Sequence, residues 1–390
     1  MRLAYKYRIY PNQEQIEQLE KTFSFCCFLY NSALEERISF YKKTSKSLSY
    51  NSQAAELPAI KEVFEDQTDS IYSQTLQATL KQLDSAYKGF FRRVKAGSGK
   101  AGFPRFKNKD RFRSILFPQC DLKTGGIKRL ENRKVKIYGI DGEVSVWWHR
   151  PLRGRCKNVR VSKQGDKWFL IVSCDDVPLN ILPGTGKTTA IDLGISSFIT
   201  TDQGAKLLHP KPYKMAKEKI ARLNQKLANK KRGSNNRLRA RQSLARAYEK
   251  VSNIREDFLH KTANKLITEN DVIIVEKLNV KGMMEQKGFA VSKSNIQDAS
   301  WSNFVAKLSY KAERAGRKLI EVNPANTSKM CSQCGNVKEH MALSDREYLC
   351  EACGFKADRD HNAAINIKRL GMSLAAGVPP ASEASSFRTG

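Results

Sequence analysis

The chain has 390 residues, with 69 Lys and Arg against 39 Asp and Glu, which gives a formal net charge of +30. This length leaves room for about two to four domains. So large a positive excess predicts a polyanionic partner, with nucleic acid as the first candidate and a merely soluble basic protein as the alternative.

No uninterrupted apolar run of about eighteen residues occurs, so we expect no membrane span. The first residues, "MRLAYKYRIYPNQEQ", lack the apolar centre of a secretory signal, and we therefore expect a cytoplasmic protein. In that compartment the nine cysteines favour reduced thiols, some of them on a metal, over disulfides. Five of them lack ligand spacing and are predicted core thiols: Cys26, Cys27, Cys120, Cys156 and Cys174.

The first half of the sequence predicts a helical block inserted into a β unit. Residues 3–10 alternate as a strand does, and Pro11 ends it. From Gln13 to about Lys95 the apolar residues recur at three- and four-residue steps, which indicates helices. Residues 112–180 indicate short strands separated by turns.

The second half begins with a segment that resembles a phosphate-binding loop only superficially. In "LNILPGTGKTT" Ile181 occupies the position where such a loop requires its first glycine. The segment also precedes a strand instead of following one, so we interpret it as a linker. A hairpin with Asp192 in its first strand is predicted next. Residues 214–255 then predict a long helical pair with fourteen Lys and Arg, which favours contact with phosphates over a merely solvated face.

Two further strands complete the predicted second half. The run "DVIIVEKLNV" is typical of a buried parallel strand, with Glu276 at its end. A helix over "WSNFVAKLSYKAERAG" precedes another strand, "KLIEVNP". The small and polar residues of the C-terminal segment predict a disordered tail.

Four cysteines have the spacing of a zinc site. Cys331 and Cys334 are separated from Cys350 and Cys353 by fifteen residues, so two knuckles could close a tetrahedron of thiolates. Gly335 and Gly354 follow the pairs, where such turns need glycine. An iron–sulfur site lacks its usual spacing here, and isolated core thiols are the other alternative. No ligand position stays open, so we predict one structural Zn²⁺.

Three acids lie where strands or a helix begin or end. Asp192 interrupts an apolar strand, Glu276 follows "VIIV", and Asp360 precedes "NAAINIKRL". Taken singly, these could be a turn cap, a solvent-facing strand end and a helix N-cap. Together they predict a ribonuclease H-like arrangement, in which carboxylates at the C-terminal edge of a sheet hold two Mg²⁺ ions for in-line attack on a phosphodiester.

The motifs "IDLGI", "VEKLNV", "CSQCG", "CEACGF" and "DRDHNAAINI", in this order, resemble the TnpB family of transposon-encoded RNA-guided DNA nucleases, relatives of type V CRISPR effectors. The segments "YRIYPNQEQ", "FLYNSALEER" and "GFPRFK" also look like the family's. The resemblance therefore extends over most of the chain. Without it, the residues alone indicate a basic metal-dependent nuclease with a zinc insert.

The resemblance implies a multidomain α+β and α/β protein. It would combine a β-barrel-like wedge domain, an inserted helical recognition domain, and an RNase H-like (RuvC) nuclease domain with a zinc-ribbon insert that binds target nucleic acid. The expected ranges are wedge 1–11, recognition 12–103, wedge 104–182, RuvC 183–325, zinc-binding insert 326–356, RuvC 357–372 and disordered tail 373–390.

By motif, the resemblance makes Asp192, Glu276 and Asp360 the catalytic Mg²⁺ ligands, with Asp358 as the rival for the third role. It places the readers of a transposon-adjacent DNA motif near Tyr50, Ser73 and Gln77, although Ser73 stands where we expect a basic residue. The implied partners are an element-encoded guide RNA and double-stranded target DNA, bound by a monomer.

Three other functions fit parts of the pattern. A DNA-cutting-and-joining transposase with an RNase H-like core would use the same acids for strand transfer. A nuclease-inactive, RNA-guided DNA-binding repressor would bind without cutting, but it should lack at least one acid. A ribosome-associated zinc protein would explain the charge and the cysteines, but not the acids.

Overall fold

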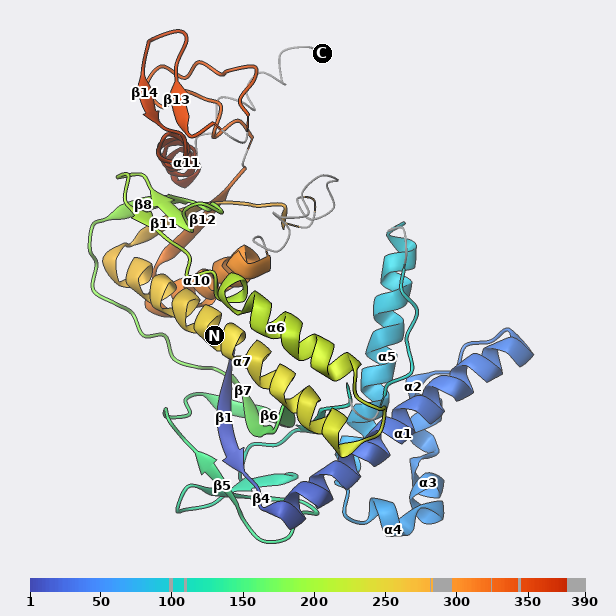
Figure 1. Cartoon of the computed structure of the whole chain (residues 1–390). Helices are drawn as coiled ribbons and strands as arrows, with labels where there is room; N and C mark the ends of the chain where they lie inside the picture. Colours follow the sequence, from blue (N-terminus) through green and yellow to red (C-terminus); the bar gives the residue numbers. More distant parts are fainter. Residues whose placement is uncertain are drawn as a thin grey trace. The chain divides into compact units, whose positions relative to one another are not determined.

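The computed structural model describes residues 1–97, 101–108, 111–280, 282, 297–323, 325–342 and 345–376 (Figure 1). The chain divides into two compact units, Met1–Pro178 and Leu179–Gly390. Each unit combines helices with a sheet, so the protein is of mixed α/β class. Among the described residues, no helix has the length and apolar character that crossing a membrane requires.

The N-terminal unit contains a seven-stranded sheet in the order β2-β6-β7-β1-β5-β4-β3, in which all paired strands are antiparallel. Alternate side chains of β7 are buried, as expected for a sheet with one face on a core. The strands are β1 (Leu3–Tyr10), β2 (Ser114–Pro118), β3 (Ile127–Arg129), β4 (Lys134–Ile137), β5 (Val144–Trp147), β6 (Arg155–Gln164) and β7 (Lys167–Asp175).

The two edge strands of this sheet approach each other. A Cβ atom on Gly126, next to β3, would lie 2.3 Å from a ring carbon of Phe117 on β2. The Cys120 thiol also donates to the carbonyl of Ile127, at 3.2 Å. The sheet is therefore nearly closed.

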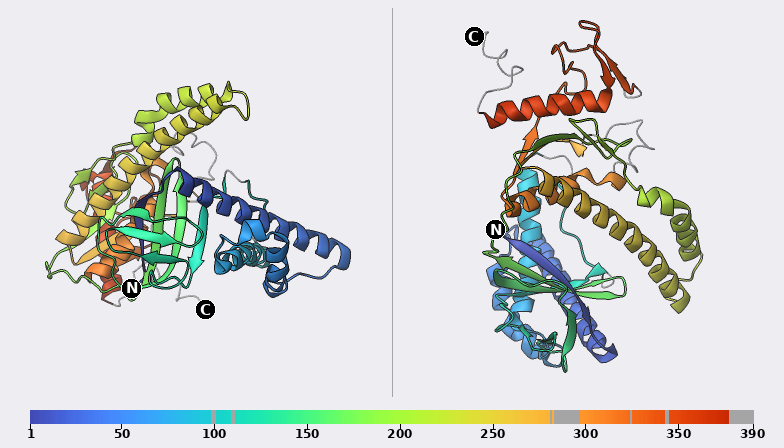
Figure 2. Two further views of the ribbon diagram at one scale, coloured as in Figure 1. Left: turned by 90° about the horizontal axis from the view of Figure 1, so that it is seen from below. Right: turned by 90° about the vertical axis from the view of Figure 1, so that its left-hand side faces the viewer.

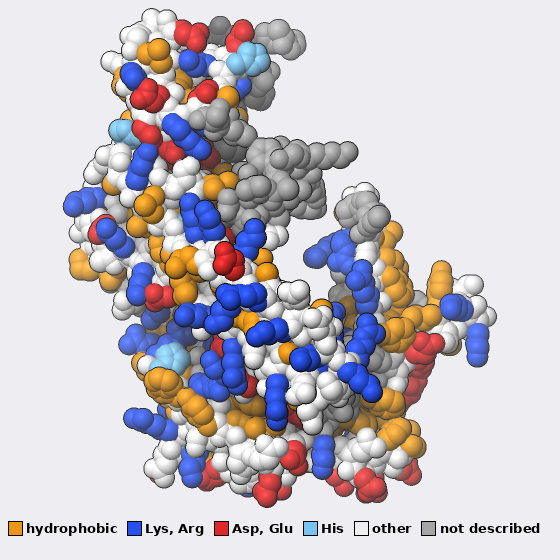
Figure 3. Space-filling view, in the orientation of Figure 1, with side chains coloured by type: hydrophobic (Ala, Val, Ile, Leu, Met, Phe, Trp, Pro, Cys, Tyr) orange, Lys and Arg blue, Asp and Glu red, His pale blue; other side chains and the backbone are white. Residues whose placement is uncertain are grey.

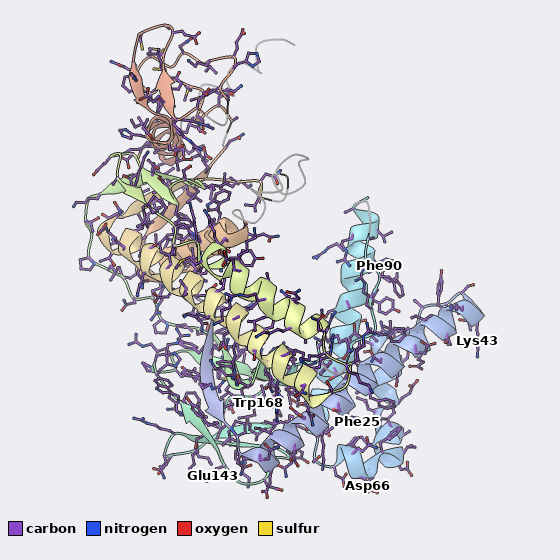
Figure 4. The ribbon with its side chains drawn as sticks, in the orientation of Figure 1. Phe25, Lys43, Asp66, Phe90, Glu143 and Trp168 are labelled. Atoms are coloured by element: carbon purple, nitrogen blue, oxygen red, sulfur yellow. The ribbon has the colours of Figure 1, made fainter. Side chains whose placement is uncertain are left out.

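The helices of this unit all come between β1 and β2 in the chain, as the sequence predicts. They are α1 (Gln13–Thr44), α2 (Tyr50–Ala55), α3 (Leu57–Val63), α4 (Glu65–Thr68) and α5 (Ser73–Lys95). A capping box begins α1: the Asn12 side chain accepts the Gln15 N–H at 2.8 Å, and the Gln15 side chain accepts the Asn12 N–H at 3.0 Å. Phe25 of α1 lies against the ring of Phe64, with centroids 5.9 Å apart, where the short helices join the core (Figure 4).

The C-terminal unit contains a five-stranded sheet in the order β10-β9-β8-β11-β12. Strands β8, β11 and β12 are parallel, and β9 and β10 complete the sheet in antiparallel pairs, so the predicted hairpin and the predicted buried strand are both present. The strands are β8 (Thr188–Asp192), β9 (Ile199–Thr201), β10 (Lys206–Leu207), β11 (Val272–Glu276) and β12 (Lys318–Val322).

Helices cover both faces of this sheet (Figure 2). On one face Phe198 packs with Leu259 of α7 and Phe304 of α10, and on the other Ala190 and Ile274 pack with Ile367 of α11. Such a three-layer arrangement buries both faces of parallel strands. The helices are α6 (Pro212–Ala228), α7 (Asn235–Glu269), α10 (Trp301–Ala315) and α11 (Arg359–Ala375).

The unit boundary and the end of α11 differ from the expected ranges. Asn180 and Leu182 donate backbone hydrogen bonds to Arg314 and Ala315, so the chain joins the second unit before residue 183. Helix α11 continues to Ala375, into the segment 373–390 predicted as a tail, because buried Gly371 packs against Ile274 and holds this turn on the sheet. Residues 377–390 of the predicted tail lie outside the described residues.

Candidate functional site

The sheet of the C-terminal unit brings two acids to one edge. Asp192 is the last residue of β8 and Glu276 the last of β11. The two strands are parallel and pair with Ile191 opposite Val275. The two carboxyl groups therefore lie side by side at the carboxyl edge of the sheet, which is where open α/β sheets place their functional groups.

The third acid reaches this edge from helix α11. Asp360 lies in the first turn of α11, which packs over β8 and β11. Its Oδ2 lies 4.0 Å from the position that a Cβ atom on Gly194 would occupy, two residues beyond Asp192. Asp192, Glu276 and Asp360 are thus brought together from three separate parts of the chain, and we call them the carboxylate cluster.

The electrostatics of the cluster show how crowded its charges are. Burial raises the pKa of Asp192 well above its ordinary value, and the charges of Glu276 and Asp360 raise it further, against the opposing effect of Arg359. Burial likewise raises the pKa of Glu276, although a hydrogen bond from the Thr327 hydroxyl opposes the change. A bound cation would relieve this repulsion, and carboxylate oxygens are the ligands that Mg²⁺ prefers, so the donor set fits that ion.

Asp358 has a different environment from Asp360. Its side chain accepts the His361 N–H at 3.1 Å and so caps α11, and it pairs with the Lys206 ammonium at 2.7 Å. Burial alone would raise the pKa of Asp358, but the Lys206 ammonium and the His361 N–H hold it below its usual value. The helix N-cap considered for Asp360 is therefore Asp358, and Asp360 lies in the first turn of α11 without capping it.

The four cysteines form a second cluster, which we call the cysteine cluster. The Sγ atoms of Cys331 and Cys353 lie 3.8 Å apart, and those of Cys334 and Cys350 lie 3.5 Å apart. Among the described residues, these four offer donor atoms that all lie within 4.8 Å of one another. Tetrahedral Zn²⁺ with Zn–S bonds of about 2.3 Å requires S···S distances of about 3.8 Å, so the thiols fit that ion.

The local backbone explains how the cysteine cluster forms. The N–H groups of Gly335 and Gly354 donate to the carbonyls of Cys331 and Cys350 at 2.9 and 3.0 Å, which closes each knuckle. Both glycines have positive φ, 81° and 73°, a conformation that a side chain would strain. The second knuckle lies between the paired strands β13 (Glu347–Leu349) and β14 (Lys356–Asp358).

Two of the residues predicted to read DNA, Ser73 and Gln77, lie along one side of α5, and the third, Tyr50, begins α2. Ser73 and Gln77 are one helical turn apart, and the next residue in that row, Lys81, lies with its ammonium 5.5 Å from the ring of Tyr50. The Lys61 ammonium donates to the Ser73 hydroxyl at 3.2 Å. A basic group therefore lies at Ser73 although the residue itself is neutral, a feature that the sequence did not indicate.

The predicted basic helical pair is present as α6 and α7. Lys and Arg side chains gather over these two helices (Figure 3), and from Lys214 to Arg255 every one of them is exposed or half-buried. Such a surface favours contact with a phosphate backbone.

Sequence reasoning missed three polar residues around the two clusters. Thr327 donates its hydroxyl to Glu276 Oε1, and Asn362 and Asn366 of α11 hold the loop that carries Cys331. The one available signal was the pair of asparagines four residues apart in "DHNAAINI", which places both amides on one face of a helix.

The fold and the two clusters define a mixed α/β protein with a set of acids suited to divalent cations and a four-thiol metal centre. Three family models match parts of the chain. Residues 174–287 match the OrfB_IS605 family ("Probable transposase") and residues 301–367 match a "Cas12f1-like, TNB domain". Residues 1–46 match a "Helix-turn-helix domain" family, although here they form one strand and one long helix.

Curated relatives cover almost the whole chain. A "Putative RNA-guided DNA endonuclease" from Streptomyces pristinaespiralis is 31% identical over 99% of this chain and 94% of its own length. The "Putative RNA-guided DNA endonuclease InsQ" of Escherichia coli K12 is 28% identical over 96% of this chain and 93% of its own length. The chain therefore belongs to the TnpB family.

A solved structure has a similar fold. It is the "Cryo-EM structure of the Cas12f1-sgRNA-target DNA complex", whose chain matches with a TM-score of 0.53 and 15% identity over 92% of this chain and 83% of that chain. At this level of identity the similarity concerns the fold alone.

Proposed function

We propose that this chain is an RNA-guided, metal-dependent DNA endonuclease of a transposable element, which cleaves double-stranded DNA beside a short transposon-adjacent motif. One observation carries the proposal: Asp192, Glu276 and Asp360 meet at the carboxyl edge of the sheet in a chain that is 31% identical to an RNA-guided endonuclease relative over 99% of its length. Three carboxylates on such an edge suit phosphodiester hydrolysis.

The domain roles follow from this proposal. The five-stranded sheet with its covering helices is the RuvC-type, RNase H-like nuclease, and the cysteine cluster belongs to its target-nucleic-acid-binding insert. The nearly closed seven-stranded sheet is the wedge domain, with α1 to α5 as the inserted recognition domain. We assign one structural Zn²⁺ to the four thiols.

The carboxylate cluster would hold two Mg²⁺ ions, with Asp358 outside it as a helix cap. When bound, these ions supply activation of a water molecule and stabilisation of the leaving 3′-oxygen. The chain itself gathers the negative charge: Asp192 and Glu276 are fixed at adjacent strand ends, Asp360 is presented by the first turn of α11, and the Thr327 hydroxyl orients Glu276.

Nucleic acid is bound largely through charge in this proposal. With a net charge of +30, the chain suits a guide RNA paired to a target strand, which a protein holds by its shape and its phosphates. Tyr50, Ser73 and Gln77 lie where α2 meets α5 and are assigned to contact the adjacent-motif duplex, with the Lys61 ammonium beside them. We propose that the protein acts as a cytoplasmic monomer.

The bound nucleic acid tests the proposal and separates it from its rivals. The protein would be purified from cells that carry its native locus, and the co-purifying RNA sequenced. A discrete RNA whose 3′ end runs past the element boundary supports RNA guidance. Heterogeneous or absent RNA would instead favour a strand-transferring transposase that uses the same three acids. A discrete RNA without any DNA cleavage would favour a nuclease-inactive repressor.

A further inference from the structure

Helix α11 is bonded to the loop that carries the first zinc ligand. The Asn362 amide donates to the Met330 carbonyl at 2.8 Å and accepts the Ser332 N–H at 2.9 Å. One turn later the Asn366 amide donates to the same Met330 carbonyl at 2.6 Å, and Arg369 donates to the Ser332 carbonyl at 2.7 Å. The backbone on both sides of Cys331 is therefore held by one face of α11.

The same helix face reaches a residue that contacts the carboxylate cluster. The Asn366 amide also donates to the Thr327 carbonyl, at 2.9 Å. The hydroxyl of Thr327 in turn donates to Glu276 Oε1. All of these groups are enclosed, since the exposed fractions are 2% for Thr327, 0% for Asn366 and 7% for Glu276. Buried hydrogen bonds of this kind fix the geometry of the groups that they join.

The orientation of the Asn366 amide is set by its partners. Thr327 and Met330 both present carbonyl oxygens, so the NH₂ group must face them and the amide cannot flip. Because that amide bonds both carbonyls, it fixes the distance between Thr327 and the residue next to Cys331. A displacement of the first knuckle would therefore move the hydroxyl that contacts Glu276.

We propose that Asn362, Asn366 and Thr327 form a positioning relay, through which the cysteine cluster sets the orientation of the Glu276 carboxylate. The inference rests on the proposed function, because it treats Glu276 as a ligand of the catalytic cation. Asn362 and Asn366 act by holding the loop, and Thr327 by holding the carboxylate. None of the three is assigned a contact with substrate. The metal centre of the insert is thus connected to the nuclease site as well as stabilising its own hairpin.

The first test replaces the hydroxyl. Thr327→Val keeps the shape of the side chain and removes the donor, whereas Thr327→Ser keeps the donor. We expect Thr327→Val to weaken Mn²⁺ binding to the protein by about 10- to 100-fold, as loss of a partner that orients a metal ligand does, and Thr327→Ser to restore it. The measurement is Mn²⁺ titration followed by electron paramagnetic resonance, with zinc content assayed in parallel and expected to stay at one per chain.

Thr262→Val is the matched control. Thr262 is also buried in the C-terminal unit, with 8% of its surface exposed, but it lies on α7 away from both clusters. It should leave Mn²⁺ affinity unchanged. Unchanged Mn²⁺ affinity in Thr327→Val, or a Thr327→Ser variant as weak as Thr327→Val, would overturn the relay.

The second test asks whether Asn366, which bonds the loop that carries Cys331, acts through Thr327. Asn366→Asp keeps the size of the side chain but turns a carboxylate toward two carbonyl oxygens, so the loop should release the hydroxyl. We expect this variant, like Thr327→Val, to weaken Mn²⁺ binding. In the double variant the two losses of affinity should not add. Fully additive losses would show that the two residues act independently and would contradict the relay.

The design separates this inference from the proposed function. Mn²⁺ affinity is measured without nucleic acid, so it reports on the relay even if the protein cuts no DNA. A wild-type chain that binds Mn²⁺ at the carboxylate cluster but cleaves nothing would count against the proposed function alone. A wild-type chain that cleaves DNA while Thr327→Val keeps full Mn²⁺ affinity would count against the relay alone.

Discussion

The four cysteines come from one segment, Cys331–Cys353. The three carboxylates come from separate parts of the chain: the end of β8, the end of β11 and the first turn of α11. The cysteine cluster is closed by hydrogen bonds within its own two knuckles. The carboxylate cluster needs the whole sheet, in register, and α11 packed on its face. The ligands of one site thus come from one short segment, whereas those of the other meet only in the complete fold of the unit.

The two clusters also differ in how they affect stability without a metal. Two of the four thiols, Cys334 and Cys353, are exposed and two, Cys331 and Cys350, are buried, so solvent reaches half of the cysteine cluster. In the carboxylate cluster, burial and mutual repulsion raise the pKa of Asp192, so its ionised form destabilises the metal-free protein. Groups that are costly to the fold and suited to a ligand are typical of functional sites.

The largest expected effect comes from Asp192→Ala. Removal of one ligand should reduce DNA cleavage to background while the zinc content and the binding of RNA and DNA stay unchanged. In metal-free buffer at neutral pH the variant should unfold at an equal or higher temperature, because a repelled buried charge has gone. Cleavage assays, filter binding and thermal unfolding check these outcomes. Loss of binding would show that Asp192 is structural.

The next comparison separates two acids that are neighbours in the sequence. Asp360→Asn should lower cleavage by at least about 10- to 100-fold, the loss that removal of even a partner of a metal ligand causes. Asp358→Ala removes the helix cap and the partner of Lys206, so it should cost roughly 0.5–2 kcal/mol in stability and leave most cleavage intact. Cleavage rates and unfolding temperatures of both variants are the measurement. A larger loss of cleavage in the Asp358 variant than in the Asp360 variant would reassign the third ligand to Asp358.

Cys331→Ser should reduce cleavage less than the substitutions of the catalytic acids do, and it should reduce stability more. The variant should lose its bound zinc and lower the unfolding temperature, because metal affinity contributes directly to folding in such knuckles. Cleavage should fall through misfolding of the insert. Zinc content by emission spectroscopy is the measurement, and Cys156→Ser, in the other unit, is the control that should keep its zinc. A zinc content unaltered in Cys331→Ser would exclude the four-thiolate site.

The smallest effect concerns an acid at the opposite end of β11. Asp271 accepts the Thr185 and Gly186 N–H groups at 2.9 and 2.7 Å and pairs with Arg317, and these donors hold its pKa below the usual value. A lowered pKa stabilises the fold above the unfolded-state value of about 3.9, and this contribution is lost as the pH falls through the folded-state pKa.

Asp271→Asn should therefore lower the unfolding temperature at pH 7, and the difference from wild type should shrink as the pH falls below about 4. Thermal unfolding of both proteins across that range is the measurement. A difference that is independent of pH would mean that the ionised carboxylate contributes nothing there. The result contrasts Asp271, whose carboxylate has hydrogen-bond donors and a cation beside it, with Asp192, whose carboxylate is buried beside other acids.

The sequence predicted those features that depend on short segments. Cysteine spacing placed all four thiols, and apolar runs placed Asp192 within a strand and Glu276 at the end of one; the structure ends β8 at Asp192 and β11 at Glu276. The residues alone did not separate Asp358 from Asp360, and only the resemblance favoured Asp360; the cap geometry then shows Asp358 as the N-cap of α11 and Asp360 in its first turn. The sequence also missed the bond from Thr327 to Glu276, since the two residues lie 51 positions apart and meet only when the sheet and the loop are assembled.

We propose that the carboxylate cluster cuts the DNA that the bound RNA selects. The most direct measurement is cleavage of two plasmids, which differ only in the target sequence beside the same adjacent motif, by protein loaded with either of two matching guide RNAs in Mg²⁺. Each RNA should direct cutting of its own plasmid, and Asp192→Ala should cut neither. Cutting that ignores the RNA, or that persists in Asp192→Ala, would contradict the proposal.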